Sequence, residues 1–352
     1  MRILILCKRH YTNKDLMSDR FGRLYHIPVQ LGRHGQEVLV LAADYRSSLP
    51  ANLVEPSVEF RSLPVSPLSL FRYLRDVDET AKDFEPNIVL ASGDTPLGLA
   101  GRRLSRRVGA RFVFDVYDNY QAFASARVPG MRARFRSLVS SADLVLAVSE
   151  SLRELLGPAV NSLVLSNGVD TEVFRPMDKA EQRARLGIAD DEVIVGYVGG
   201  VVENRGIETL IEAVGLLDEP ARLVLAGPVD GKVDHRGTDW VDYRGVIPHA
   251  EVASLINVCD VAVLPYPDSN WARYTNANKL HEYLACQVPV VVTDISDYRQ
   301  WAASPEAVCR PSDPGDMARA IEFQLQRRAV AVNAAVTWEA QARTLLGALQ
   351  AL

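Results

Sequence analysis

The fold is indicated most clearly by the stretch NANKLHEYLACQVPVVVT at residues 276–293. The side chain of Asn276 is suited to cap a helix, and we expect that helix to run to about Cys286, because Pro289 follows and cannot continue it. The valines at 290–292 read as the start of a buried strand. A helix that leads directly into a buried strand is the repeating unit of parallel α/β folds.

The start of this predicted helix carries polar residues that suit a nucleotide. Asn278, Lys279 and Glu282 lie within about one turn, because residues three and four apart share a helix face. The free N–H groups and the dipole at a helix start favour a phosphate, and Lys279 adds a full positive charge. Glu282 can accept hydrogen bonds from two sugar hydroxyls. The alternative is an ordinary exposed Lys279–Glu282 pair, which contributes only about 0.3 kcal/mol.

Working outward, short apolar runs alternate with helix-like stretches along the whole chain. The strands that we expect are residues 3–6, 38–41, 88–91, 112–114, 144–148 and 163–165 in the first half, and 193–198, 223–225, 261–264 and 290–292 in the second. This rhythm predicts two doubly wound α/β domains, with ligands at the carboxyl ends of the strands and a cleft between the facing domains. We place the domains at 1–172 and 190–330, an interdomain linker at 173–189, and at 331–352 a C-terminal helix that packs back towards the N-terminal domain.

Composition restricts the class of protein. With 352 residues, 48% hydrophobic and 24% charged, the chain reads as a globular protein too long for one hydrophobic core. It contains no run of about 18 apolar residues, and its apolar start is too short for a signal peptide. Four scattered cysteines without a CxxC spacing indicate buried thiols in a reducing cytoplasm, and no metal-ligand cluster stands out.

The charge is distributed unevenly. Residues 1–175 carry a net charge of +4 and the remainder −9. Two arginine clusters lie in the first half, at 102–107 and at 132–136, the second beside Val128, Pro129 and Met131. Basic edges with apolar neighbours can rest on an anionic membrane surface; the alternative is a solvated helix face. Nucleic acid is disfavoured as a partner, because the chain is acidic and these clusters lack interleaved aromatic residues.

Two turns of the second half also suit a nucleotide. Gly199 and Gly200 follow a predicted strand and let backbone N–H groups approach a phosphate, which Arg205 can clamp. The GxGxxG spacing of dinucleotide-binding proteins is absent, so a dehydrogenase is disfavoured. In the turn at 245–248, the backbone around Val246 can read a nucleobase edge; the alternative is a strand that simply ends in a proline turn.

Taken together, these motifs resemble the glycosyltransferase family 4 branch of the GT-B superfamily. The resemblance covers nearly the whole chain, is strongest from Asp143 to Val292, and rests on five segments in order: SNGVDTEVFRP at 166–176, the loop at 199–206, AGP at 226–228, GVIP at 245–248 and NKLHEYLA at 278–285. It implies two Rossmann-like domains, an acceptor held by the first and a nucleotide-sugar donor held by the second, and transfer without a metal or a cofactor.

The resemblance also implies roles for individual residues. Arg205 and Lys279 neutralise the leaving diphosphate, Glu282 binds the ribose hydroxyls, and Val246 meets the base. We therefore expect a hexosyltransferase that moves a sugar from a UDP- or GDP-linked donor to a hydroxyl of a glycan or lipid-linked glycan, in cell-surface polysaccharide biosynthesis. Such an enzyme is expected in the cytoplasm, peripherally bound to the inner face of the membrane.

The chain departs from the family pattern at two positions of the donor site. Many relatives carry an arginine where this chain has Gly200, and a glutamate eight residues before the ribose glutamate, where this chain has Tyr274. The absent glutamate normally lies near the donor sugar. Its replacement leaves the identity of the sugar and the stereochemical course, retention or inversion, unassigned by sequence.

A replacement carboxylate is available in the first domain. Asp118 follows the predicted strand at 112–114 and occupies a position where relatives often have a catalytic histidine or aspartate, so we interpret it as the general base. The alternative is that Asp115 or Asp118 caps the next helix. The polar stretch 9–23 replaces the usual acceptor loop, and we expect it to be mobile and to present Asp19, Arg20 and Gly22 to the acceptor.

Two other functions remain compatible with the sequence. The GT-B fold also hosts sugar-nucleotide epimerases, for which additional acidic groups are expected in the donor pocket, where this chain has Tyr274. A catalytically degenerate partner subunit is the second alternative, motivated by Gly200 and Tyr274. A degenerate subunit is expected to lose donor affinity, whereas Arg205, Lys279 and Glu282 remain in this chain, so an active enzyme is favoured.

Overall fold

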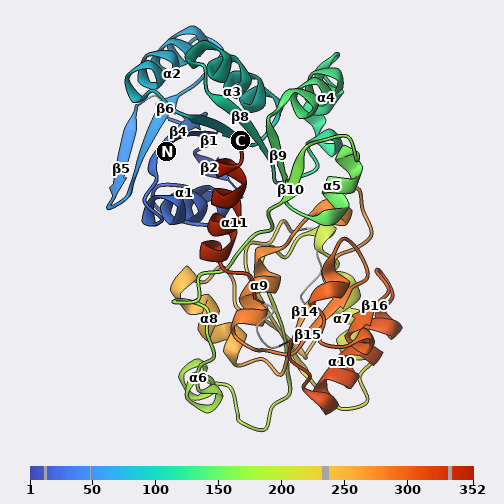
Figure 1. Ribbon diagram of the computed structural model, residues 1–352. Helices are drawn as coiled ribbons and strands as arrows, with labels where there is room; N and C mark the ends of the chain where they lie inside the picture. Colours follow the sequence, from blue (N-terminus) through green and yellow to red (C-terminus); the bar gives the residue numbers. More distant parts are fainter. Residues whose placement is uncertain (12–13, 48, 232–237, 332–334) are drawn as a thin grey trace. The chain divides into compact units, whose positions relative to one another are not determined.

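The computed structural model describes residues 1–11, 14–47, 49–231, 238–331 and 335–352, which form two compact α/β units (Figure 1). Unit 1 comprises Met1–Gly168 and Trp338–Leu352, and unit 2 comprises Val169–Thr337. Each unit contains a largely parallel sheet covered by helices, which confirms the fold class predicted from the alternating sequence pattern.

Unit 1 is built on an eight-stranded sheet with the order β10-β9-β8-β7-β1-β4-β6-β5, in which only β5 runs antiparallel. Its strands are β1 (Arg2–Lys8), β4 (Glu37–Asp44), β5 (Ala51–Glu55), β6 (Val58–Pro64), β7 (Ile88–Ser92), β8 (Arg111–Val116), β9 (Leu144–Ala147) and β10 (Ser162–Val164). A separate ribbon pairs β2 (His10–Tyr11) with β3 (Lys14–Asp15). The helices are α1 (Arg23–Arg33), α2 (Leu70–Phe84), α3 (Thr95–Val108), α4 (Met131–Ser141), α5 (Glu150–Leu156) and α11 (Trp338–Gln350).

The central strand β1 is buried on both faces, which explains its continuous apolar sequence. Ile3 and Ile5 point to a core that includes α1 and α11, whereas Leu4 and Leu6 point to a core that includes α2 and α3. Figure 1 shows these two pairs of helices on opposite faces of the sheet. Burying each of these side chains stabilises the unit by about 1.5–3 kcal/mol.

The last helix of the chain returns to the first unit. Helix α11 packs against α1, where the rings of Trp338 and His26 stack with centroids 5.4 Å apart. Trp338 is buried, and so are Leu345 and Leu349 further along the same face of the helix. The segment 331–352 therefore contains a helix that belongs to unit 1; its residues 332–334 lie outside the described part of the chain.

Unit 2 is built on a six-stranded parallel sheet with the order β13-β12-β11-β14-β15-β16. The strands are β11 (Ile194–Val198), β12 (Arg222–Ala226), β13 (Val241–Tyr243), β14 (Val261–Leu264), β15 (Val290–Thr293) and β16 (Val308–Cys309). The helices are α6 (Lys179–Leu186), α7 (Ile207–Gly215), α8 (His249–Asn257), α9 (Asn278–Ala285) and α10 (Pro314–Arg327). In both units, helices follow the strands closely, so that loops collect at the carboxyl ends of the strands.

The segment 173–189 differs from the linker that its charged sequence predicts. It belongs to unit 2 and contains helix α6, with Phe174 buried and Arg183 almost fully buried. The Arg183 guanidinium pairs with Asp260 at 2.9 Å and donates to the carbonyl of Val258. The charges that suggest a solvated linker are instead partners of a strand terminus, and the second unit begins at Val169.

The helix at the start of the opening stretch is also shorter than expected. Helix α9 begins at Asn278 with Ala277 in the N-cap position, and no side chain caps it. Asn276 is not the cap, because its side chain is hydrogen-bonded to the ring of His281, with Oδ1 and Nε2 3.0 Å apart. No helix in the described ranges is long and apolar enough to cross a membrane.

Candidate functional site

Two glycine-containing turns of unit 2 come into contact at the carboxyl ends of neighbouring strands. Gly199 follows β11 and Gly227 follows β12, with φ values of 150° and 136° that L side chains rarely adopt. A Cβ atom on Gly227 would stand 2.0 Å from the carbonyl oxygen of Gly199. Only glycine permits this approach, which brings the two turns together at the place where a parallel α/β sheet binds ligands.

Lys279 lies directly over the first of these turns. A Cβ atom on Gly199 would stand 2.3 Å from its Nζ, so the glycine is required for the lysine to occupy this place. Nζ donates hydrogen bonds to the hydroxyls of Tyr197 and Tyr266, at 2.9 and 3.1 Å. Burial acts to lower the pKa of Lys279, but the two tyrosines outweigh it and the pKa is raised overall. The side chain is therefore a cation at neutral pH.

Arg205 is the second cation of the site, at the end of the turn η3 (Glu203–Arg205). Its guanidinium carbon lies 3.7 Å from the centroid of the Trp271 ring and 5.3 Å from that of Tyr266. Its NH1 nitrogen is buried and has no hydrogen-bond partner in the described structure. The following Gly206 is fixed by close packing, since a Cβ there would stand 1.9 Å from the carbonyl oxygen of Pro265.

Helix α9 contributes two further polar groups. Asn278 carries a buried Oδ1 atom that has no partner among the described residues, and it belongs to the first turn, where helix N–H groups are free. Glu282 is half-buried one turn later, and burial raises the pKa of its carboxyl to about 7, against the opposing effect of Lys279. The exposed Lys279–Glu282 pair considered from the sequence is not formed, because the ammonium group is directed to the two tyrosines.

The remaining predicted donor-side residues are Val246, Gly200 and Tyr274. Val246 is 71% exposed in the turn after Gly245, whose φ is 71°. The carbonyl of Gly200 accepts a hydrogen bond from the Tyr197 hydroxyl at 3.0 Å. Tyr274 is half-buried at the end of the turn η4 (Ala272–Tyr274). An exposed apolar side chain beside a backbone turn suits a flat nucleobase.

The cations of this cluster lack the partners that cations in a folded protein usually have. In the part of the chain that the structure describes, neither Arg205 nor Lys279 makes an ion pair with a carboxylate. Both are half-buried, so leaving them without an anion is costly. An arrangement of two fixed cations, free helix N–H groups and an unpaired carboxyl group can bind a diphosphate and, beside it, a pair of hydroxyls.

In unit 1, Asp118 lies just beyond β8 in a mostly buried aromatic setting. Its carboxylate accepts a hydrogen bond from the N–H of Asn119 at 2.8 Å. Burial first, and the charge of Asp118 second, raise the pKa of Tyr11, whose ring meets that of Tyr117 edge to face at 5.2 Å. The capping alternative does not apply to the next helical turn, because η1 (Tyr120–Ala122) has Asn119 in its N-cap position and no side-chain cap.

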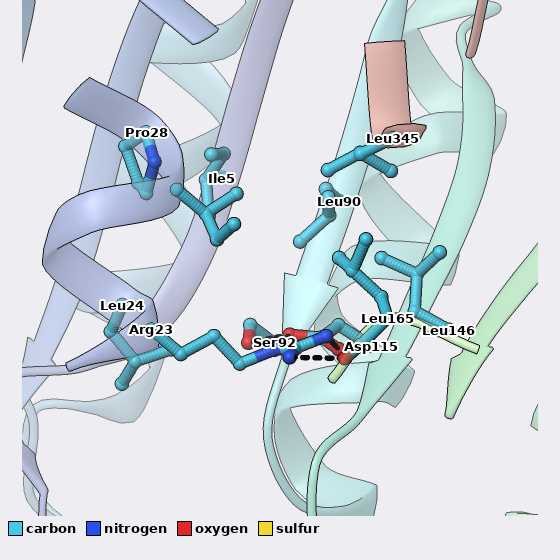
Figure 2. Close-up of a pocket in the computed structure, with 11 residues that line it drawn as sticks. Ile5, Arg23, Leu24, Pro28, Leu90, Ser92, Asp115, Leu146, Leu165 and Leu345 are labelled. Carbon is cyan, nitrogen blue, oxygen red and sulfur yellow. Dashed lines mark hydrogen bonds and ion pairs between the residues drawn. The ribbon is translucent and has the colours of Figure 1, made fainter. Parts of the chain in front are cut away.

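Asp115, the other capping candidate, is part of a buried ion pair that sequence reasoning missed. Its two oxygens accept from Nε and NH2 of Arg23 at 2.8 and 2.7 Å, and Oδ2 accepts from Ser92 Oγ at 2.5 Å (Figure 2). Arg23 also donates to the carbonyl of Leu165. The adjoining apolar cavity, of about 10 Å³, holds no more than a water molecule. This cluster joins α1 to three strand ends and offers no room for a substrate.

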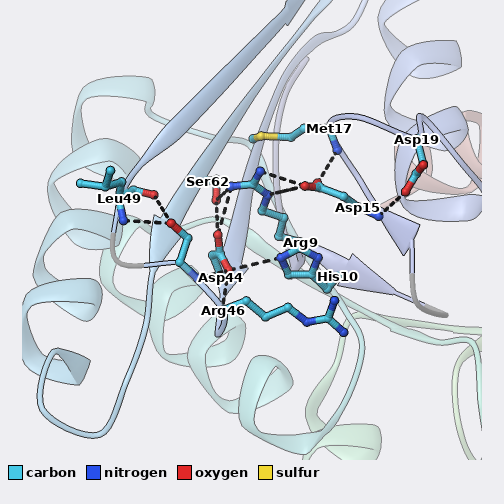
Figure 3. A network of polar contacts seen from close by, with 10 residues as sticks. Arg9, His10, Asp15, Met17, Asp19, Asp44, Arg46, Leu49 and Ser62 are labelled. Atoms are coloured by element: carbon cyan, nitrogen blue, oxygen red, sulfur yellow. Dashed lines mark hydrogen bonds and ion pairs between the residues drawn. The ribbon is translucent and has the colours of Figure 1, made fainter.

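The described residues of the predicted acceptor loop make several polar contacts. Arg9 binds Asp15 and the buried Asp44, with nitrogen-to-oxygen distances of 2.9 and 3.0 Å (Figure 3). The N–H of Asp15 donates to Asp19 at 2.6 Å, and Arg20 pairs with Glu55 at 3.3 Å.

The remaining predicted acceptor-side residue, Gly22, has φ of 72° and precedes α1. Thr12 and Asn13, also in the predicted loop, lie outside the described residues. Across the described ranges, no group of three or more histidine, cysteine, aspartate or glutamate side chains is arranged to hold a metal ion.

Two family descriptions match the chain, one for each half. Residues 192–327 match the model described as glycosyl transferases group 1, and residues 23–168 match the glycosyl transferase 4-like domain. The two matched regions correspond to the cores of unit 2 and unit 1 and together cover most of the 352 residues.

Named relatives extend this similarity. The chain is 28% identical over 222 residues to the putative teichuronic acid biosynthesis glycosyltransferase TuaC of Bacillus subtilis, a match that covers 61% of this chain and 54% of that protein. It is 26% identical over 328 residues to a GDP-mannose-dependent alpha-mannosyltransferase of Mycolicibacterium smegmatis, covering 86% of this chain and 82% of the relative.

Solved structures share the fold at lower identity. Sucrose-phosphate synthase from Thermosynechococcus elongatus superposes with a TM-score of 0.74 at 21% identity, over 99% of this chain and 94% of that one. Anabaena HepE, solved in complex with UDP-glucose, superposes with a TM-score of 0.74 at 17% identity, over the full length of both chains.

Proposed function

The chain belongs to the glycosyltransferases of the GT-B superfamily, of family 4-like type, and from this membership we propose that it moves one sugar from a nucleoside diphosphate to a hydroxyl of a glycan or lipid-linked glycan. The observation that carries the proposal is the cluster in unit 2, where, among the described residues, Arg205 and Lys279 have no counter-ion and the carboxyl group of Glu282 has no hydrogen-bond partner. A diphosphate and a ribose supply the missing partners of all three.

For the donor we propose a UDP- or GDP-linked hexose. Both bases are represented among similar proteins, since the mycobacterial relative is named for GDP-mannose and the HepE structure contains UDP-glucose. In this assignment the backbone around the exposed Val246 meets the base, and Gly199 and Gly200 let backbone N–H groups approach the diphosphate. Asn278 adds the free first turn of α9. Tyr274, which replaces a family glutamate, faces the donor sugar.

The chemistry follows from these assignments. The acceptor oxygen forms a bond to the anomeric carbon while the bond from that carbon to the diphosphate oxygen breaks, and the hydroxyl proton passes to the Asp118 carboxylate. Negative charge develops on the departing diphosphate, where the fixed cations Arg205 and Lys279 stabilise it without reorganisation. This set of residues performs the transfer without a metal ion or a cofactor.

For the acceptor we propose a precursor of a cell-surface polysaccharide, since one relative is named for teichuronic acid biosynthesis. Asp19, Arg20 and Gly22 belong to the turn before α1 and form the acceptor side in this proposal. Because Arg9 and its partners hold this loop in place, the acceptor meets a preformed surface.

A lipid-linked acceptor places the enzyme on the cytoplasmic face of the membrane, and helix α4 is the surface that suits it. Arg132, Arg134 and Arg136 are exposed and make no ion pair within the described ranges, and Val128 beside them is 51% exposed. The arginines of α3 fit less well, because Arg103 pairs with Asp78. Flotation with anionic liposomes tests this location: binding by the wild type that is lost when the three α4 arginines become glutamine supports it, and no binding by the wild type refutes it.

The nucleotide is identified by a thermal-shift screen with UDP, GDP, ADP, TDP and CMP. A ligand that binds only the folded state raises the melting temperature by mass action. We expect one nucleoside diphosphate to produce a shift that disappears in Glu282→Ala. If no nucleotide raises the melting temperature of the wild type, the donor-site assignment is wrong and a catalytically degenerate subunit is favoured.

Catalysis is tested with Asp118→Asn once the donor is known. General-base catalysis contributes about 10²- to 10⁴-fold, so turnover is expected to fall by that factor while donor affinity stays the same. Asp143→Asn is a matched control, since this carboxylate pairs with Arg111 and accepts from the N–H of Phe112. Near-normal turnover of Asp118→Asn refutes the base role.

A further inference from the structure

Arg205 and Lys279, which make no ion pair among the described residues, share one aromatic neighbour. The hydroxyl of Tyr266 accepts from Nζ of Lys279 at 3.1 Å, and the face of the same ring lies 5.3 Å from the guanidinium carbon of Arg205. Tyr197 completes the contacts of the lysine and Trp271 those of the arginine. Through these contacts, a single side chain fixes the position of one cation relative to the other.

The hydrogen bonds between Lys279 and its two tyrosines have defined directions. The Tyr197 hydroxyl donates its one proton to the carbonyl of Gly200 at 3.0 Å, so towards Lys279 it can only accept. The lysine is thereby joined through Tyr197 to the glycine turn. Both contacts orient the ammonium group without neutralising it, because a phenol oxygen supplies a dipole and not a charge.

Tyr266 is itself rigidly held. It is 3% exposed, and Thr293 at the end of β15 donates to its carbonyl oxygen at 2.8 Å. Its ring meets Trp271 at 5.3 Å and Tyr298 edge to face at 6.2 Å. A side chain fixed on so many sides transmits its position to the groups that contact it.

We propose that Tyr266 is a positioning residue that holds Arg205 and Lys279 as one diphosphate-binding pair of cations. Tyr266, Tyr197 and Trp271 together form the aromatic frame around this pair. Aromatic rings can stabilise two neighbouring cations without supplying an anion that competes with the ligand. A carboxylate in the same place would pair with both cations and weaken phosphate binding. The inference rests on the donor site proposed above and adds that the frame makes the site select diphosphates over monophosphates.

The variant Tyr266→Phe isolates this role. It removes the hydroxyl that accepts from Lys279 and keeps the ring that faces Arg205. The two cations should therefore keep their charges but lose their fixed position relative to one another. Isothermal titration with the nucleoside diphosphate and the monophosphate of the same base gives a ratio of affinities. Hydrogen bonds to charged groups contribute enough that we expect this ratio to fall about tenfold.

Two comparisons separate positioning from a general structural effect. In a Lys279→Met background, Tyr266→Phe should change the ratio no further, since its effect passes through the lysine. The matched control is Tyr283→Phe, which removes a buried hydroxyl that accepts from the N–H of Val198 at 2.9 Å and is expected to lower the melting temperature without changing the ratio.

Each outcome has one interpretation. An unchanged ratio in a Tyr266→Phe protein that still binds nucleotide, or equal effects of Tyr266→Phe with and without Lys279, overturns the positioning role and leaves the donor site intact. A wild-type protein that binds neither nucleotide instead overturns the proposed function.

Discussion

The carboxyl ends of the two sheets differ in how two of their cations are accommodated. In unit 1, the charged side chains at the strand ends are paired with one another, as in Lys8–Asp94 at 2.6 Å, Arg9–Asp44 at 3.0 Å and Arg23–Asp115 at 2.7 Å. In unit 2, Arg205 and Lys279 lie at the carboxyl ends of the strands and contact aromatic rings and hydroxyls. The paired charges of unit 1 stabilise the fold, whereas Arg205 and Lys279 are the residues at which we propose that a charged ligand binds.

The contrast is not a general property of unit 2. At the amino ends of its strands, Asp260 pairs with both Lys179 and Arg183 and accepts from the N–H of Ile194. Unit 2 pairs Lys179 and Arg183 at the amino end of β14, and it also pairs Arg273 with Asp268 and Arg299 with Asp294 in the loops after β14 and β15. That Arg205 and Lys279 make no ion pair among the described residues therefore points to a functional reason, because an unpaired half-buried cation lowers stability. The four predictions below test whether this division between architecture and binding holds.

The largest effect is expected from breaking the buried pair of unit 1. Arg23→Met leaves the buried Asp115 carboxylate without its partner, which should lower the free energy of unfolding by about 3–5 kcal/mol. Urea denaturation followed by circular dichroism measures the change. Adding Asp115→Leu should restore much of the loss, and nucleotide affinity should be unaffected in both variants. A single variant as stable as the wild type would show that the pair is not architectural.

The next effect comes from the buried face of α9. Burial lowers the pKa of His281 to about 4, against an ordinary value of 6.5. Its contribution to stability is therefore fully present above about pH 6.5 and is lost as the pH falls through about 4, because only the unfolded chain takes up the proton. This loss amounts to roughly 3 kcal/mol.

The measurement is a comparison of urea unfolding at pH 7 and pH 4.5 for the wild type and His281→Gln, in which the contributions of other titrating groups cancel. The wild type should lose more stability on acidification than the variant does. Identical losses in the two proteins contradict a neutral, buried His281.

Two lysines of unit 2, substituted one at a time, test whether paired cations stabilise the fold and unpaired cations bind the ligand. Lys279→Met should weaken binding of the nucleoside diphosphate about 10- to 100-fold without lowering the melting temperature, since the charge it removes has no partner in the free protein. Lys179→Met, which breaks a pair with Asp260, should lower the melting temperature and leave binding of the nucleoside diphosphate unchanged. The two variants are compared by titration calorimetry and thermal melts, and the account fails if both behave alike.

The smallest effect concerns pH and the ribose. Burial raises the pKa of Glu282 to about 7, so its carboxyl gains charge between pH 6 and pH 8. The ionised form accepts from both ribose hydroxyls, and nucleotide affinity should therefore rise severalfold over this range. Subtracting the profile of Glu282→Gln removes the titration of the phosphate itself. Parallel profiles for the two proteins exclude Glu282 from ribose binding.

Sequence reasoning reached the fold because apolar runs and turn residues are local signals. The strand at 290–292 and the cluster Asn278, Lys279 and Glu282 follow from spacing alone. The capping role of Asn276 was wrong, because its competing partner, His281, is a packing neighbour that no cap rule takes into account. The linker at 173–189 differed for a similar reason, since the charges of α6 meet Asp260 from a distant part of the chain.

The aromatic frame lay beyond sequence reasoning altogether. Tyr197 lies in β11, whereas Tyr266 and Trp271 lie in the segment that follows β14, and nothing in their spacing predicts that they surround two cations. The pairing of Arg23 with Asp115, 92 residues apart, is equally invisible. Such contacts depend on side-chain directions that only the folded chain defines.

The central claim is that unit 2 binds a nucleoside diphosphate through Arg205 and Lys279. It is tested most directly by isothermal titration of UDP and GDP into the wild type and into a variant that carries Arg205→Met and Lys279→Met together. We expect one diphosphate to bind the wild type, and the variant, with an unchanged melting temperature, to show no measurable binding. Equal affinity of the wild type and the variant for that diphosphate would contradict it.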